Sequence, residues 1–286
     1  MAQDKYNAQD KYNSVWVSHS SIGDFLKCPR LYFLHNVYKN EHGRKINITS
    51  PSLSLGIAVH ETLEGLTKYK AEERFLKPLE ESFEEEWKKV AGKQGGFKNE
   101  QEEKEAKERG KNMILKVAKN PGPLLHKTVK LKPANNDMPP NFFLSENENI
   151  VLNGKIDWLE YIEEDDSIRV IDFKTGKNEE KENSLQLPIY LLLLKNLQKR
   201  KVSGAAYWYL DRDDEPVSAK LPDARKAYDD VLLIARKIKI AREKKEFNCP
   251  KGSGGCFACH PFEKILKGEA EFIGVGGYGQ EMYLLP

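Results

Sequence analysis

Two aspartates and a lysine lie close together in this chain of 286 residues, and their types and spacing could support chemistry on a charged substrate. Asp172 and Lys174 are two positions apart, with one residue between them, within an apolar run, and Asp157 lies in an earlier apolar run. Side chains two apart on a β-strand share a face, so Asp172 and Lys174 would point the same way. Two carboxylates beside a lysine form a site for a hard divalent cation and an activated water. Many Asp-x-Lys pairs are ordinary surface ion pairs, so the surrounding sequence must decide.

A β-hairpin is expected to position these residues. Residues 151–161 and 168–175 are rich in apolar and β-favouring side chains, and the polar stretch 163–167 is typical of a solvated turn. Ile171 and Phe173 would pack into a core, leaving the aspartate–lysine pair on the opposite face of the strand. The earlier aspartate, on the partner strand, could reach the same spot.

Two expected helices carry further polar residues. The first, at 53–70, places Gly56 and His60 one turn apart on one face. Such a histidine is either a hydrogen-bonded structural residue or a metal ligand. The second helix begins near Gln186 and places it one turn before Tyr190, on the same face. The tyrosine is then either a half-buried residue of an apolar helix or a group close to the reacting atoms.

The motifs together resemble the PD-(D/E)XK nuclease superfamily. They are most similar to its RecB-like exonuclease branch, which includes the CRISPR-associated adaptation nucleases and the nuclease domains of bacterial recombination helicases. The resemblance runs from about residue 18 to about residue 267, nearly the whole chain. Its motifs are, in chain order, Cys28-Pro29, Gly56-x-x-x-His60, Gly154-x-Ile-Asp157, Asp172-Phe-Lys174 and Gln186-x-x-x-Tyr190.

This resemblance implies a fold and a set of roles. The fold would be α/β, a mixed central sheet flanked by helices with a helical N-terminal elaboration. Magnesium or manganese would lower the pKa of bound water and neutralise charge on the scissile phosphate. Lys174 would orient or help activate the water, while Gln186 and Tyr190 would fix water and substrate. The implied metal ligands are His60, Asp157, Asp172 and the backbone carbonyl of Phe173.

The implied activity is metal-dependent hydrolysis of DNA. The resemblance favours a single-stranded DNA exonuclease of repair or recombination, with a helicase as a possible partner. A CRISPR adaptation nuclease that trims pre-spacers shares the same chemistry and differs in its partner proteins. A noncatalytic DNA-end-binding module and a structural metal protein with an incidental Asp-x-Lys are further alternatives. The sequence has no Gly-x-x-x-x-Gly-Lys-Ser/Thr motif, so any ATP-driven unwinding would come from a partner.

All four cysteines of the chain are expected to form one metal site. Cys249, Cys256 and Cys259 occupy a glycine-rich loop, and Cys28 lies far upstream. Four thiolates suit either a zinc ion or an iron–sulfur cluster. Several RecB-like nucleases hold a [4Fe–4S] cluster with one N-terminal and three C-terminal cysteines, which favours the cluster. In those relatives a close pair commonly comes first, whereas here the six-residue gap does, so zinc, with His260 as a possible ligand, stays open.

Composition limits the other classes of protein. The net charge is only +2, so any nucleic-acid path must come from local patches. Basic clusters at 195–201 and at the end of an expected helix at 224–245 could follow phosphates. The sequence has no apolar stretch long enough to span a bilayer and no signal-peptide core, which predicts a cytoplasmic protein without a membrane partner.

One nuclease domain is expected at 18–267. It would contain a charged helical elaboration at 71–140 and a catalytic core at 141–245. The stretch 1–17, which contains a repeated polar hexapeptide, is expected to be a disordered leader, and 268–286 to be a C-terminal tail.

Overall fold

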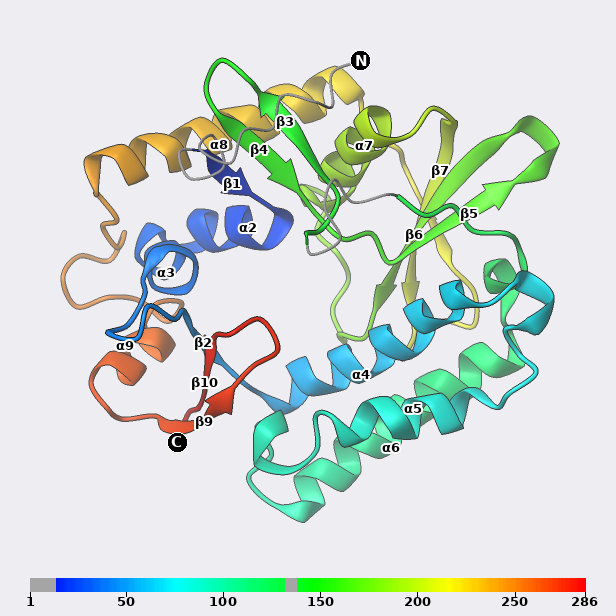
Figure 1. Ribbon diagram of the computed structural model, residues 1–286, viewed down its shortest axis with the longest axis horizontal. Coiled ribbons are helices and arrows are strands. Elements are labelled where there is room, and N and C mark those ends of the chain that lie inside the picture. The colour runs from blue at the N-terminus through cyan, green and yellow to red at the C-terminus, as the bar shows by residue number, and fades with distance from the viewer. Residues whose placement is uncertain (1–13, 132–137) are drawn as a thin grey trace.

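A four-stranded mixed sheet holds the aspartate–lysine motif in the computed structural model, which describes residues 14–131 and 138–286 (Figure 1). Its strands are ordered β5 (Trp158–Ile162), β6 (Ser167–Lys174), β7 (Lys201–Tyr209) and β8 (Val217–Ala219). The outer pairs are antiparallel, and β6 and β7 are parallel because α7 (Gln186–Leu197) connects them. The expected α/β fold with a mixed central sheet is confirmed.

The hairpin β5–β6 forms with Trp158 opposite Ile171, and its turn closes through Asp166 in the left-handed region (φ 49°). The first arm of the expected hairpin was too long. Residues 150–153 instead form β4 (Ile150–Asn153) of another sheet, and this strand ends just before Gly154. A Cβ on Gly154 would lie 2.9 Å from a methyl carbon of Leu193 on α7, so the chain passes close to this helix before it enters β5.

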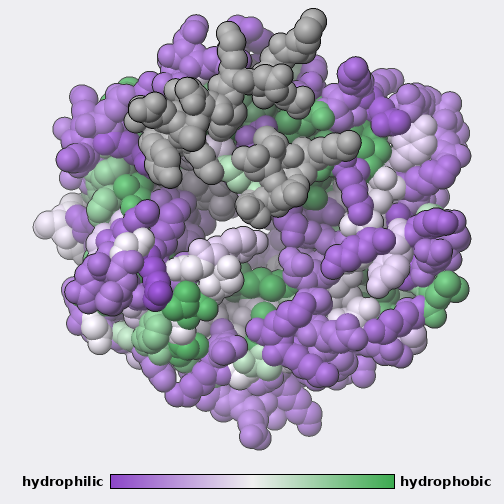
Figure 2. Space-filling view, viewed as in Figure 1, coloured by the Kyte–Doolittle hydropathy of each residue, from purple (hydrophilic) through white to green (hydrophobic). Residues whose placement is uncertain are grey.

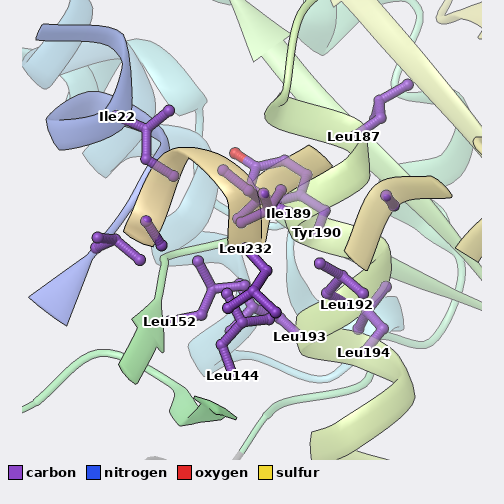
Figure 3. Close-up of a cluster of buried hydrophobic side chains, with 14 of the residues drawn as sticks. Ile22, Leu144, Leu152, Leu187, Ile189, Tyr190, Leu192, Leu193, Leu194 and Leu232 are labelled. Atoms are coloured by element: carbon purple, nitrogen blue, oxygen red, sulfur yellow. The ribbon is translucent and has the colours of Figure 1, made fainter. Parts of the chain in front are cut away.

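The two faces of the central sheet are covered by different helices. Ile171 and Phe173 pack with α4 (Pro51–Gly65), α5 (Leu79–Lys88) and α6 (Glu100–Lys119) in one buried cluster. The expected charged elaboration is therefore a cover for this face, with Phe83 and Trp87 of α5 fully buried. Val170 faces the other side, in a second cluster with α7 and α8 (Ala224–Lys244), part of which Figure 3 shows.

A second sheet, ordered β1-β4-β3, packs beside α7 and α8. Its strands are β1 (Val15–Val17), β4 and β3 (Asn141–Ser145), and β1 runs parallel to β4 with Val15 opposite Ile150. The expected disordered leader at 1–17 is therefore corrected at its end, since β1 lies within it; residues 1–13 lie outside the described part. Ser18 then caps α2 (His19–Lys27) with its hydroxyl.

A third sheet brings the two halves of the sequence together. Strands β9 (Glu271–Val275) and β10 (Glu281–Leu284) form a hairpin, and β10 pairs in parallel with β2 (Ile46–Ile48). The segment expected to be a tail is thus part of the fold. Beside it lie α3 (Pro29–Tyr32), a π-helical turn (Phe33–Val37) and α9 (His260–Leu266). Short 3₁₀ turns occur at Leu66–Lys68, Ala71–Glu73, Gly92–Gly95, Gly122–Leu125 and Glu163–Asp165.

The surface in Figure 2 is mostly hydrophilic and is hollowed near its centre, in the space that Figure 1 shows between α2 and α4. Hydrophobic side chains gather at its lower left over the C-terminal hairpin, where Phe272 and Val275 are exposed. Within 14–131 and 138–286, no helix is both long and apolar enough to cross a membrane.

One buried cation joins the helical cover to the sheet. Arg74 is 4% exposed and donates hydrogen bonds to the backbone carbonyls of Leu66, Leu124 and His126, at 3.2, 2.7 and 2.6 Å. Its guanidinium also lies 4.9 Å from the ring centroid of Trp158. It has no carboxylate at ion-pair distance among the described residues, so backbone carbonyls and the ring stabilise the charge.

Arg74→Met should lower the free energy of unfolding by about 3 kcal/mol, because it leaves three backbone carbonyls, two of them in buried hydrogen bonds, without their donor. Urea denaturation followed by circular dichroism measures this change. Lys68→Met, at an exposed position nearby, is the matched control and should change the value by less than about 0.5 kcal/mol. Equal stabilities of the two variants would contradict a structural role for the arginine.

Candidate active site

Asp172 lies at the centre of the candidate site, on the face of β6 that is directed toward α7. It is 1% exposed, and its Oδ1 accepts hydrogen bonds from Gln186 Nε2 (2.6 Å) and the Tyr190 hydroxyl (2.9 Å). Nζ of Lys174 lies 2.9 Å from Oδ2 in an ion pair. Strand alternation and the one-turn spacing on α7 therefore bring these four side chains together; their catalytic roles stay a prediction.

Lys174 is held on several sides. Besides Asp172, it donates to the Gln186 amide oxygen, and it forms a 2.7 Å ion pair with Glu180. Its ammonium lies 5.2 Å from the ring centroid of Tyr207. Burial alone would lower the pKa of Lys174, but these carboxylates outweigh it and raise the pKa, so the lysine stays charged. Glu180 was not among the predicted site residues; the signal for it in the sequence is its position in the polar loop directly after the motif.

Asp157 lies on the other side of the strand end, next to α4. Its Oδ2 accepts a hydrogen bond from the backbone N–H of Phe173 (2.8 Å) and lies 3.5 Å from His60 Nδ1. Glu64, one turn further along α4, approaches the same imidazole nitrogen at 3.7 Å. Glu64 was not among the predicted ligands, although it shares the helix face of His60. The carbonyl of Phe173 as a ligand stays a prediction.

The carboxylates of this site favour a positive charge. Burial, followed by repulsion from Asp157, raises the pKa of Asp172 to about 7. Burial works against the charge of His60, yet Asp157 and Glu64 outweigh it and raise its pKa to about 10. A site that stabilises a protonated histidine this strongly also favours a cation in its place. Burial and the same aspartates raise the pKa of Tyr190 well above its usual value, so its hydroxyl remains a donor.

The donor set fits a divalent ion. One ligand atom each from His60, Glu64 and Asp157 lies within 4.8 Å of the others. Oδ2 of Asp172 is buried and, among the described residues, has no well-directed hydrogen bond, although Lys174 is at ion-pair distance. Carboxylate oxygens with one imidazole suit magnesium or manganese.

The four cysteines form a second cluster, away from the sheet. Cys259 Sγ lies 4.0 Å from the sulfur of Cys249 and 3.8 Å from that of Cys256, and all four sulfurs, including that of Cys28, lie within 4.8 Å of one another. Three of the thiols are buried and Cys256 is half-buried. Backbone hydrogen bonding, first from Cys259, lowers the pKa of the Cys256 thiol to about 7, which favours the thiolate form that binds metals.

The spacing of the sulfurs bears on which metal they fit. Four thiolates around a single tetrahedral ion at about 2.3 Å lie roughly 3.8 Å apart. A [4Fe–4S] cubane bonds each cysteine to a different iron, so its sulfur ligands lie on a larger tetrahedron. The observed distances match one ion more closely than a cubane. His260 was a possible zinc ligand in the sequence. Its Nε2 instead lies 2.8 Å from the carbonyl oxygen of Gly254.

Comparison with known proteins agrees with the fold and the motif. A model of the PD-(D/E)XK nuclease superfamily matches residues 16–261. The chain therefore belongs to the PD-(D/E)XK nuclease superfamily, a class of metal-dependent nucleases that use magnesium or manganese. A search of curated protein sequences gave no significant match.

Proposed function

We propose that this protein is a metal-dependent deoxyribonuclease that degrades single-stranded DNA from an end. The observation that supports it best is the convergence of Asp157, Asp172 and Lys174 at one strand end, where the buried Oδ2 of Asp172 is ion-paired with Lys174 but accepts no well-directed hydrogen bond from the described residues. A noncatalytic end-binding module has no need for this arrangement, because burying Asp172 beside a second carboxylate is costly.

Each residue would have a distinct role in hydrolysis. His60, Glu64, Asp157 and Asp172 would hold magnesium or manganese, which when bound lowers the pKa of water and neutralises charge on the scissile phosphate. Lys174 would orient the attacking water and stabilise the developing negative charge. Gln186 and Tyr190 both donate hydrogen bonds to Asp172. This geometry supports a role for the two residues in positioning the Asp172 carboxylate, rather than the expected contact with water and substrate.

The narrower features of the proposal rest on the resemblance to RecB-like nucleases. An end-directed attack on single strands, a place in DNA repair or recombination and a helicase partner would follow from that branch. The CRISPR adaptation nuclease remains the alternative from the same branch, since its site would use the same residues.

For the cysteine cluster we propose a structural metal rather than a catalytic one. It would join Cys28 to the loop 249–259 and so tie α3 to the C-terminal part of the fold. The sulfur spacing favours a single zinc ion, and the [4Fe–4S] cluster favoured by the resemblance is the alternative.

Lys174→Met should lower the rate of DNA cleavage by about 10²-fold, since it removes the charge beside the reacting phosphate. The measurement is degradation of end-labelled single- and double-stranded DNA with manganese, magnesium or chelator, using protein purified without oxygen. Lys177→Met, in the exposed part of the following loop, is the control and should cut at the wild-type rate. If the wild type binds DNA but cuts none with either metal, the nuclease hypothesis is wrong and the noncatalytic end-binding module is the better interpretation.

A further inference from the structure

A cavity of about 720 Å³ lies outside the candidate active site, between the π-helical turn, α9 and the segment that follows α8. These elements lie together at the left of Figure 1, whereas the strand end that carries Asp172 belongs to β6. Apolar and cationic side chains both line the cavity. The apolar side chains are Phe33, Leu34, Val37, Phe247 and Leu266, and the cationic side chains are Arg30, Arg242 and Lys245.

The apolar wall is built from a row of aromatic rings. Phe33 and Phe247 stack with their centroids 5.0 Å apart, and Tyr32 continues the row at 6.2 Å from Phe247. Phe25 and Tyr38 extend it at either end. Phe33 and Phe247 are half-buried and line the cavity, so they offer an aromatic surface that the rest of the row holds in place.

The cations of the cavity differ in whether they are paired. Arg30 forms a 2.8 Å ion pair with Glu263 and so neutralises the one carboxylate in the lining. Arg242 and Lys245 have no carboxylate at ion-pair distance within the described chain; Arg242 donates only one weak side-chain hydrogen bond, to the Tyr32 hydroxyl at 3.3 Å. Two uncompensated positive charges therefore lie beside the aromatic wall, which makes an anionic ligand with a flat apolar part the complementary one.

We propose that this cavity is a second binding site for single-stranded nucleic acid, in which a base stacks on the wall of Phe33 and Phe247 and the flanking phosphates contact Arg242 and Lys245. Stacking on aromatic rings combined with cationic phosphate contacts is the general means of holding single strands without regard to sequence. The site rests on the proposed nuclease function, and it would retain the strand at a distance from the catalytic carboxylates.

The cysteine cluster contributes to this site. Phe247 lies two residues before Cys249, and Arg30 donates to the carbonyls of Gly252 and Ser253 in the cysteine loop. A metal held by the cysteines would thus fix one side of the aromatic wall. This gives the proposed structural metal a consequence for strand binding as well as for stability.

The test is the affinity of a fluorescently labelled thymidine oligonucleotide, measured by anisotropy in calcium over a range of salt, with intact oligonucleotide verified afterwards. Arg242→Gln combined with Lys245→Gly removes both charges; Gln keeps a donor for Tyr32, and Gly suits the left-handed backbone at this position (φ 56°). We expect affinity to fall about ten-fold and the salt slope to flatten by roughly 1.4, for two lost contacts. Lys237→Gln, exposed on α8 outside the cavity, is the control and should match the wild type.

Phe247→Leu separates stacking from charge. It should also lower affinity about ten-fold, but without a change in the salt slope. Hydrolysis of bis(p-nitrophenyl) phosphate, which reaches only the catalytic residues, should be unchanged in all of these variants. Wild-type affinity in both cavity variants, with DNA cleavage intact, overturns this site and leaves the nuclease standing. Lost affinity in a protein that never cuts supports the site and overturns the nuclease, and absence of any binding by the wild type overturns the site.

Discussion

Asp172→Asn should lower the rate of DNA cleavage by more than about 10³-fold, while the thermal midpoint stays equal to that of the wild type near pH 4 and rises a few degrees above about pH 7. The carboxylate is the proposed link between the metal and Lys174, so cleavage depends on it. Its burial beside Asp157 raises its pKa to about 7, which means that the folded state holds its charge at a cost. Asparagine has the same shape and carries no charge.

The pH dependence of this gain follows from the sign of the shift. An aspartate whose folded pKa lies above its unfolded pKa of about 3.9 weakens the folded state increasingly as the pH rises between the two values. The stability gain of Asp172→Asn should thus be absent near pH 4 and complete above about pH 7. Differential scanning calorimetry without added magnesium or manganese measures it.

The control for this prediction is Asp165→Asn, at an exposed position in the turn between β5 and β6. It should change neither cleavage nor the midpoint. If Asp172→Asn instead cleaved DNA normally and melted several degrees lower, the carboxylate would be a structural group and the catalytic assignment would be wrong.

Cys28→Ser should lower the free energy of unfolding by about 5 kcal/mol, the largest loss of stability that we expect from one substitution. The thiol is fully buried and lies within 4.8 Å of the other three. Removing one ligand weakens the metal, and the binding free energy of a structural metal is part of the folding free energy. Serine would also leave a buried hydroxyl in an apolar cluster that contains Leu31 and Phe262.

The measurement combines thermal unfolding with elemental analysis of the purified protein. Ser253→Ala, exposed in the cysteine loop, is the control and should retain both metal and stability. One zinc per chain would agree with the sulfur spacing. Iron with acid-labile sulfide and visible absorption would identify the cluster. The proposed site would be contradicted if the wild-type protein were stable without zinc or iron and the Cys28→Ser variant had the same thermal midpoint.

The parts of the site with a local sequence signal were predictable. Strand alternation placed Asp172 and Lys174 on one face, and helical spacing paired Gln186 with Tyr190. The break before Asp157 was missed because residues 151–161 read as one continuous apolar run, although Gly154 lies against α7. The contact of Glu180 with Lys174 depends on the path of a loop, which side-chain periodicity does not describe.

Two short strands near the N-terminal end of the described chain were not predictable for a different reason. Val15–Val17 and Ile46–Ile48 are only three residues long, and their partners lie at Ile150–Asn153 and Glu281–Leu284. Such short strands are stabilised by their long-range partners, and propensity over three residues says little. The order of the strands within each sheet is likewise set by tertiary packing, whereas the fold class was predicted from the motifs.

The pairing of early with late segments has a consequence for the order of events during synthesis. Arg30 bonds to Ser253, 223 residues later, and β2 pairs with β10. At about 5–20 residues per second, the ribosome needs roughly 11–45 s to make the intervening chain. Through that interval the nascent polypeptide carries Cys28 and the edge of β2 without their partners. The early segment thus lacks its partners until the loop that holds Ser253 and then β10 have been made, and a chain that ends before residue 249 cannot complete the cysteine cluster.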